Sequence, residues 1–168
     1  MESLLLLPAS SEHVLQMMQW FPSGESCIVW GGQGFRFPFT AHTFLTDCRW
    51  SELPSYVLQQ RSGELCAFGQ YYLRAGRCHL ARLAVAPSHR GRGFGTWLIE
   101  KLMQIGTREL RVSECSLFVN VSNEAAIALY ERLGFIGAPH PETTSESSTS
   151  HYMVRSGASS KPASNASM

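Results

Sequence analysis

A short glycine-rich segment, Arg90-Gly91-Arg92-Gly93-Phe94-Gly95, contains the residue types that bind a large anion. Glycine lets the backbone approach a ligand closely, and successive N–H groups in a turn can point the same way. The segment follows an apolar run, Leu80–Ala86, and precedes a helix-like segment, Thr96–Leu110. The first turn of a helix adds unpaired N–H groups and the positive end of its dipole. The order strand, loop, helix therefore predicts a phosphate-binding loop.

The glycine spacing excludes two familiar phosphate sites. A dinucleotide fingerprint counted from Gly91 and Gly93 requires a third glycine at position 96, which is Thr96. A P-loop requires a lysine directly after its last glycine, and no lysine follows here. What remains is R-x-x-G-x-G, followed later in the chain by Asn123–Phe135, which reads N-E-A-A-I-A-L-Y-E-R-L-G-F.

These two segments resemble the acyl-CoA loop, [QR]-x-x-G-x-[GA], and the later N-x-x-A-x-x-L-Y-x-x-x-G-F segment of the GNAT superfamily of N-acetyltransferases. The resemblance covers residues 64–137. It implies an α/β single domain in which a mixed, mostly antiparallel sheet is flanked by helices. It also implies that acetyl-CoA is the cosubstrate and that a primary amine attacks it directly in a ternary complex.

The resemblance implies the site residues as well. The backbone of Leu83 and Val85 would bond the pantetheine arm, which lies between two splayed strands in this family. Asn123 would bond the cofactor near its pantetheine end, and the Tyr130 hydroxyl would protonate the leaving thiolate. The pyrophosphate would be held by a continuous set of residues: Arg90, Gly91, Arg92, Gly93, Phe94, Gly95 and Thr96.

The residues alone leave two of these assignments open. Tyr130 shares a helix face with Ile127 and Leu133, which is also typical of a core aromatic residue. Asn123 is also a good helix N-cap, and this role is compatible with cofactor binding.

The general base is not identified by the motifs. In the subgroup that resembles ribosomal-protein N-terminal acetyltransferases, a glutamate stands where this chain has Phe118, which weakens the case for a protein N terminus as acceptor. Glu64 and His79 are alternatives, and His79 has the more suitable ordinary pKa. An ordered water, or an amine that is already partly neutral, would serve without a side-chain base. His89, beside the loop, is expected to contact solvent or phosphate rather than the amine.

Charge is distributed unevenly along the chain. The net charge of +1 gives no general electrostatic case for nucleic acid or an anionic membrane as partner. Residues 65–99 contain no Asp or Glu, and their basic residues are Arg74, Arg77, Arg82, Arg90 and Arg92. A polyanionic ligand would explain this bias, although solvated side chains are an equal explanation for Arg74 and Arg77.

The cysteines favour a reduced compartment. Five cysteines are present and no two form a C-x-x-C pair, so neither a metal site nor a disulfide framework is expected. The apolar run Leu4–Leu7 is too short for a signal peptide, and no segment is long enough to span a membrane. The predicted location is the cytoplasm.

The N-terminal third is predicted to hold a strand, Ser3–Pro8, and two helices. Ser10 or Ser11 would cap the first helix, which would end at Pro22 with Gly24, and Thr40 would cap the second, which would reach about Trp50. Between them lies the predicted loop Trp30–Phe39. Two interpretations of its aromatic residues are open: they line an apolar acceptor pocket, or they fill the core beneath the loop.

The rest of the chain alternates between strands and helices. Three strands, Tyr56–Gln60, Leu65–Leu73 and Cys78–Val85, would form a meander, and Cys115–Val121 would add another strand. After the last helix and its expected cap at Gly134 come a connection over Pro139–Ser150 and a closing strand, His151–Arg155. We predict a single domain over residues 1–155 and a disordered tail over 156–168.

The sequence therefore predicts an acyl-CoA-dependent N-acetyltransferase that acts on a small primary amine. One alternative is a GNAT-like domain that senses acyl-CoA without turnover. A second is a protein N-acetyltransferase that uses the aromatic residues at 30–39 as a docking surface. The identity of the amine, the acyl-chain preference and the oligomeric state are left open by the sequence.

Overall fold

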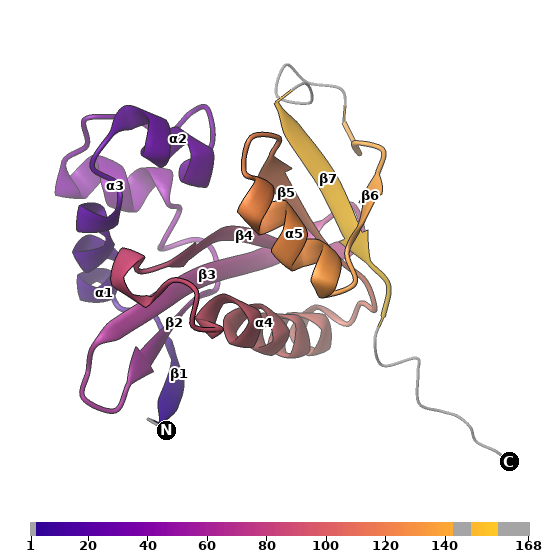
Figure 1. Cartoon of the computed structure of the whole chain (residues 1–168), viewed down its shortest axis with the longest axis horizontal. Coiled ribbons are helices and arrows are strands. Elements are labelled where there is room, and N and C mark those ends of the chain that lie inside the picture. Colours follow the sequence, from indigo (N-terminus) through magenta and orange to yellow (C-terminus); the bar gives the residue numbers. More distant parts are fainter. Residues whose placement is uncertain (1–2, 143–148, 158–168) are drawn as a thin grey trace, which may run out of the picture. The chain divides into compact units, whose positions relative to one another are not determined.

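The structure is a computed structural model that describes residues 3–142 and 149–157 (Figure 1). Its elements, with η for 3₁₀ helices, are β1 (Leu4–Pro8), α1 (Ser11–Gln16), η1 (Met17–Trp20), α2 (Gly24–Gly31), α3 (Ala41–Asp47), β2 (Ser55–Gln60), β3 (Leu65–Arg74), β4 (Arg77–Val85), η2 (Pro87–His89), α4 (Phe94–Leu110), β5 (Cys115–Asn120), α5 (Glu124–Arg132), β6 (Ile136–Ala138) and β7 (Ser150–Arg155). They belong to two compact units. Unit 1 comprises Met1–Tyr71 and Ala81–Leu102, and unit 2 comprises Tyr72–Leu80 and Met103–Met168.

The strands form a seven-stranded sheet with the order β1-β2-β3-β4-β5-β7-β6. Strand β4 runs parallel to β5, whereas the pairs β1–β2, β2–β3, β5–β7 and β6–β7 are antiparallel. The predicted α/β class, with a mixed and mostly antiparallel sheet flanked by helices, is therefore confirmed. All strands of the predicted meander are present, and among the strands of residues 3–142 and 149–157 the short strand β6 alone was not predicted.

In unit 1, side chains that alternate along β2 and β3 separate two packed faces. Val57 and Phe68 are partners across this pair, and both are fully buried in a core shared with α1, α2 and α3. The next residue, Gly69, faces the other way: a Cβ atom there would lie 2.6 Å from Leu102 Cδ1. The first half of α4 therefore lies close against this second face (Figure 1).

The short helices of unit 1 begin at reciprocal capping boxes. Ser10 and Thr40 are N-caps of α1 and α3, as the sequence predicted. A further capping box, between Ser23 and Ser26, starts α2 at Gly24. The first helical segment ends before Pro22, as predicted, but Gly24 begins a helix that was not predicted, because the serine pair satisfies the N–H groups at its start. The predicted loop Trp30–Phe39 is also too long at its start, since Trp30 and Gly31 belong to α2.

In unit 2, α5 is joined to β6 by a tight turn. Gly134 has a φ of 96°, and its N–H and that of Phe135 donate to Glu131 O and Tyr130 O, both at 3.0 Å. The predicted left-handed cap at Gly134 is therefore confirmed. Arg155 of β7 donates from Nε to Leu133 O at 2.7 Å, which ties the end of α5 to the sheet of the same unit.

Two predictions fall wholly or partly outside the described residues. The predicted tail over 156–168 is described only at Ser156 and Gly157, and the predicted connection over Pro139–Ser150 is not described at 143–148. The predicted closing strand is present as β7.

Candidate active site

The predicted phosphate-binding loop leads directly into α4. The helix begins at Phe94, two residues earlier than predicted, and Gly93 O accepts its first backbone hydrogen bond from Trp97 N at 3.2 Å. The N–H groups of Phe94–Thr96 lie in the first helical turn, where no preceding carbonyl of the helix can accept from them. Gly91 and Gly93 have φ values of 75° and 85°, which residues with a side chain rarely adopt. The loop has the backbone geometry that the motif predicted.

The two arginines of the loop take different positions. Arg90 Nε donates to Val85 O at 3.3 Å, so this side chain folds back on the end of β4. The Arg92 guanidinium lies over the ring of Phe94, with 5.1 Å from Cζ to the ring centroid. Phe94 is 8% exposed. The group at this residue that could contact a cofactor is therefore its backbone N–H and not its ring.

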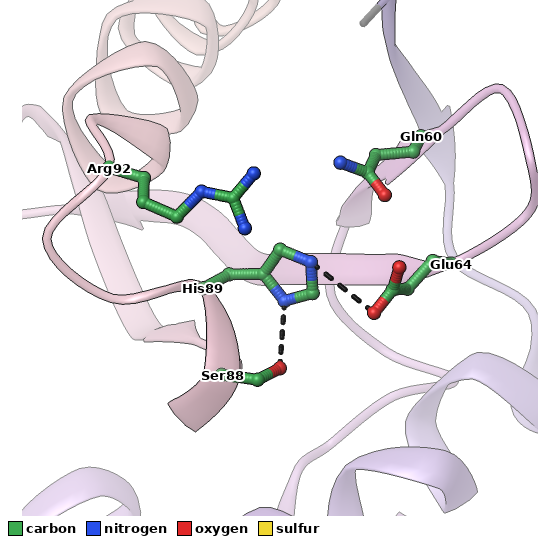
Figure 2. A pocket seen from close by; sticks show the side chains of 5 residues that line it. All are labelled: Gln60, Glu64, Ser88, His89 and Arg92. Atoms are coloured by element: carbon green, nitrogen blue, oxygen red, sulfur yellow. Dashed lines mark hydrogen bonds and ion pairs between the residues drawn. The ribbon is translucent and has the colours of Figure 1, made fainter.

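A pocket of about 390 Å³ lies beside this loop in unit 1. It is lined by Gln60 and Glu64 from the β2–β3 hairpin, and by Ser88, His89 and Arg92 from the chain around the loop (Figure 2). His89 Nε2 lies 3.4 Å from Glu64 Oε2, and His89 Nδ1 lies 3.0 Å from Ser88 Oγ. The pocket therefore contains a histidine that contacts the hairpin on one side and its own turn on the other.

The role expected of His89 needs correction. Its side chain is buried, with 3% of the residue exposed, because the ring packs against Phe94 with centroids 5.5 Å apart. Contact with solvent or phosphate was predicted from its position beside the loop, and the solvent part of this prediction is wrong. Sequence reasoning missed the pairing with Glu64 because the two residues meet only when the β2–β3 hairpin has formed.

The end of β4 carries the two residues predicted to bond the pantetheine arm. Leu83 and Val85 are half-buried and directly follow Arg82, whose φ of 50° marks an irregularity in the strand. Arg82 Nη1 donates to Gln70 Oε1 at 3.0 Å, and the fully buried Gln70 also donates to Cys48 O at 2.9 Å. A buried polar network thus holds the irregular strand in place.

Helix α5 carries the other two predicted site residues, both in unit 2. Asn123 is its N-cap, and its Oδ1 accepts from Ala126 N at 3.3 Å. Tyr130 follows two helical turns later, on the same face. It is 9% exposed and packs edge-on against Phe135, with centroids 6.0 Å apart. This burial raises the pKa of Tyr130 to about 12, so its hydroxyl is protonated at neutral pH.

His79, one candidate general base, lies inside unit 2. It is 2% exposed, and its Nδ1 lies 2.9 Å from Ser116 Oγ. Its ring packs among the rings of Tyr72 and Phe118, at centroid distances of 5.3 and 4.9 Å. These contacts favour a structural role for His79, since a base must reach the amine.

Arg74 and Arg77 also have structural contacts in unit 2. Arg74 pairs with Glu142 and lies over the Phe118 ring, 4.8 Å from its centroid. Arg77 Nε donates to Glu114 at 2.7 Å, and its Nη1 donates to Tyr152 Oη at 3.3 Å. These pairs explain the two arginines without a phosphate ligand.

The aromatic residues of unit 1 form a core cluster. We call this the aromatic cluster, which comprises Phe21, Trp30, Phe35, Phe39 and Phe44. Phe35 and Phe44 are 5% and 0% exposed, whereas the neighbouring Phe37 is 39% exposed. Of the two interpretations of the stretch at 30–39, the core interpretation is supported for all of its aromatic residues except Phe37.

Residues 17–135 match the sequence profile described as the Acetyltransferase (GNAT) family. The chain belongs to this family. The resemblance that the two motifs indicated is therefore confirmed. GNAT family members are acyl-CoA-dependent N-acetyltransferases, so the predicted enzyme class and the predicted acetyl-CoA cosubstrate agree with the family.

Two GNAT relatives of known function match parts of the chain. The mycothiol acetyltransferase of Streptomyces avermitilis is 33% identical over 91 residues, which is 51% of this chain and 28% of that protein. The [ribosomal protein bS18]-alanine N-acetyltransferase of Escherichia coli K12 is 36% identical over 100 residues, which is 59% of this chain and 65% of that protein. The chain thus spans less than two thirds of the length of each of these curated relatives.

A solved GNAT structure matches nearly the whole chain in fold. The spermidine N-acetyltransferase of Vibrio cholerae, in complex with CoA and spermine, superposes with a TM-score of 0.69 at 16% identity. The match covers 92% of this chain and 95% of that one. At this identity the likeness concerns the fold alone.

Two further observations concern the described part of this GNAT chain. Within residues 3–142 and 149–157, no three His, Cys, Asp or Glu side chains come together as a metal site. None of the helices described there combines the length and the apolar character that crossing a bilayer requires.

Proposed function

We propose that the protein transfers an acetyl group from acetyl-CoA to a primary amine of a small molecule. The observation that carries this proposal is the loop at the start of α4. Gly91 and Gly93 are both left-handed, the first-turn N–H groups follow them directly, and a Cβ at either glycine would meet no atom within 4 Å. This open, donor-lined space fits the pyrophosphate of CoA.

In the proposed reaction, acetyl-CoA supplies the thioester carbon that the amine attacks and the thiolate that leaves. The backbone N–H groups of the loop hold the pyrophosphate, together with Arg90 and Arg92. Leu83 and Val85 orient the pantetheine arm through their backbone, and Asn123 bonds the cofactor near its pantetheine end, as the family resemblance implies. As the C–N bond forms and the C–S bond breaks, the Tyr130 hydroxyl donates its proton to the sulfur. The hydroxyl is protonated at neutral pH and can therefore supply this proton.

The preference for a small amine over a protein N terminus is supported by Phe118. This apolar ring stands at the position where the resembling protein-acetylating subgroup has a carboxylate base, and its neighbour His79 is buried. We therefore propose that the amine is deprotonated by water or arrives partly neutral.

Thermal unfolding in parallel with acetyl-CoA, CoA, NAD and ATP tests the proposal. A ligand present at about 100 times its dissociation constant adds roughly 2.7 kcal/mol of stability. For a chain of this size, the melting temperature then rises by about 5 to 10 °C. We expect this shift with both CoA compounds and not with NAD or ATP. Absence of a shift with either CoA compound would refute the proposal.

A screen of small amines and peptides, followed by thiol release from acetyl-CoA, then tests the acceptor class. We expect turnover with small amines. Turnover confined to peptides would instead support the protein acetyltransferase, and CoA binding without turnover over the whole panel would support an acyl-CoA sensor.

A further inference from the structure

His89 lies immediately before the phosphate-binding loop, and contacts within unit 1 hold both its backbone and its ring. Its backbone N–H donates to Ala86 O at 2.8 Å, which closes the 3₁₀ turn η2. Its ring is buried between Phe94, the first residue of α4, and Glu64 of the β2–β3 hairpin. The side chain thus contacts the helix start through Phe94 and, as Figure 2 shows, Glu64 of the hairpin.

Backbone hydrogen bonds fix the β2–β3 hairpin next to Glu64 and His89. Gln60 N donates to Glu64 O at 2.9 Å, which closes the hairpin, and Ala86 N donates to Cys66 O at 2.8 Å. The backbone on both sides of the Glu64–His89 contact is therefore hydrogen-bonded within unit 1. A carboxylate on such a support can fix the orientation of the histidine ring that it contacts.

Each nitrogen of the His89 ring has one polar contact. Nε2 lies 3.4 Å from Oε2 of the Glu64 carboxylate, whose side chain is 57% exposed, and Nδ1 is hydrogen-bonded to the Ser88 hydroxyl at 3.0 Å. Removing the carboxylate would take away the charged partner of Nε2 and leave the ring held by Ser88 and Phe94. Because Arg90 and Gly91 follow directly, movement of this ring displaces the start of the loop.

We infer that Glu64 is a positioning residue for CoA binding, which acts through His89 on the phosphate-binding loop. This inference rests on the proposed function. It assigns Glu64 a role other than that of general base, because its carboxylate is directed to His89 behind the loop (Figure 2). Glu64 contacts no loop N–H group itself.

The first experiment compares CoA binding by calorimetry in wild type, Glu64→Ala and Glu64→Gln. We expect Glu64→Ala to raise the dissociation constant about fivefold, the ratio that corresponds to about 1 kcal/mol. Glu64→Gln keeps an oxygen that can accept from Nε2, so it should restore most of the affinity. Glu100→Ala, at an exposed position on α4, is the matched control and should bind CoA as wild type does.

A second experiment separates positioning from a general structural or catalytic role. Acetyl-pantetheine lacks the pyrophosphate, so its reaction with an amine found in the screen should be equally fast in wild type and Glu64→Ala. With acetyl-CoA, the same variant should show a higher KM and an unchanged kcat. A lower kcat with both donors would identify Glu64 as a base and refute the inference.

A double-mutant cycle tests whether the effect passes through His89. His89→Phe keeps a buried aromatic ring but removes both ring nitrogens. In this background, Glu64→Ala should leave the CoA dissociation constant unchanged, and a further fivefold rise would overturn the proposed route.

The failure of the inference can be told apart from that of the proposed function. If wild-type protein binds CoA and Glu64→Ala binds it equally well, only the inference is wrong. If wild-type protein binds no CoA, the proposed function is wrong and the inference falls with it.

Discussion

Two segments of unit 1 contain the same local pattern, Gly-x-Gly-Phe, and differ in what they do. Gly32-Gln33-Gly34-Phe35 follows α2, and Gly91-Arg92-Gly93-Phe94 precedes α4. In both, the phenylalanine is buried. In the first segment only Gly32 has a positive φ, whereas both glycines of the second do.

The difference lies in the position of the helix. In the second segment Gly93 O accepts the first hydrogen bond of α4, so the loop and the first-turn N–H groups form one continuous donor surface. In the first segment, α3 begins only at Ala41, and Phe35 enters the aromatic cluster. A glycine pair is therefore expected to form an anion site when a helix begins directly after its second glycine.

Truncating the first phenylalanine should have the largest effect on stability. Phe35→Ala removes a 5% exposed ring from the aromatic cluster and should lower the free energy of unfolding by about 3 to 5 kcal/mol. The dissociation constant for CoA should stay unchanged. Phe37→Ala, at a 39% exposed ring in the same stretch, is the control for denaturant unfolding. A loss of CoA affinity in Phe35→Ala would contradict the division of roles between the segments.

Substitution of the second glycine should weaken CoA binding in the segment before α4 and leave it unchanged in the segment after α2. Gly93→Ala places a side chain at a φ of 85° and in the space proposed for pyrophosphate. It should weaken CoA binding by roughly 100-fold in calorimetry. Gly34→Ala is the matched control, because a Cβ at Gly34 meets no atom within 4 Å and its φ is not positive. Equal affinities of the two variants would show that the loop is not the CoA site.

Tyr130 extends the comparison to a residue that is both part of a motif and buried. Burial raises its pKa from 10.0 to about 12 in the folded protein. The neutral hydroxyl therefore contributes stability that is complete below pH 10 and is lost as the pH rises towards 12.

Between pH 8 and pH 11, wild type should lose roughly 1 to 2 kcal/mol more stability than Tyr130→Phe, which has no hydroxyl to ionise. Denaturant unfolding at both pH values measures this difference. Identical losses would mean that the hydroxyl is accessible to water in the folded state. Turnover of the same variant at neutral pH tests the proposed proton donation.

The parts of the fold that could be predicted are those with local signals. The strands of the meander are separated by turns that contain Gly63 and Gly76, and α5 carries its own cap at Asn123. Helix α2 was missed because Pro22 and Gly24 are typical of a helix end, and only the Ser23–Ser26 capping box offsets them. Strand β6 has three residues and is defined by its pairing with β7, which is distant in sequence.

The same distinction applies to the candidate site. The phosphate-binding loop could be predicted because its backbone geometry depends on the positions of its glycines, which can be read directly from the sequence. The Glu64–His89 pair could not, because it depends on a hairpin that brings residues from two strands to one loop. The fate of the aromatic residues was equally undecided, because a large apolar ring suits a core and a pocket alike.

Gly69, in the middle of β3, complicates the interpretation of mutational scans of this protein. Any side chain there would meet the terminal carbons of Leu102 and Leu83, at 2.6 and 2.8 Å, so α4 would have to shift away from the sheet or its leucines repack. A shift would carry the first turn of α4 with it and lower CoA affinity. A scan scored by CoA binding would then count Gly69 among the contact residues, although it lies within the packed interior. Loss of CoA binding after a substitution can therefore reflect a residue that sets the spacing between α4 and the sheet, as well as a residue that contacts the ligand.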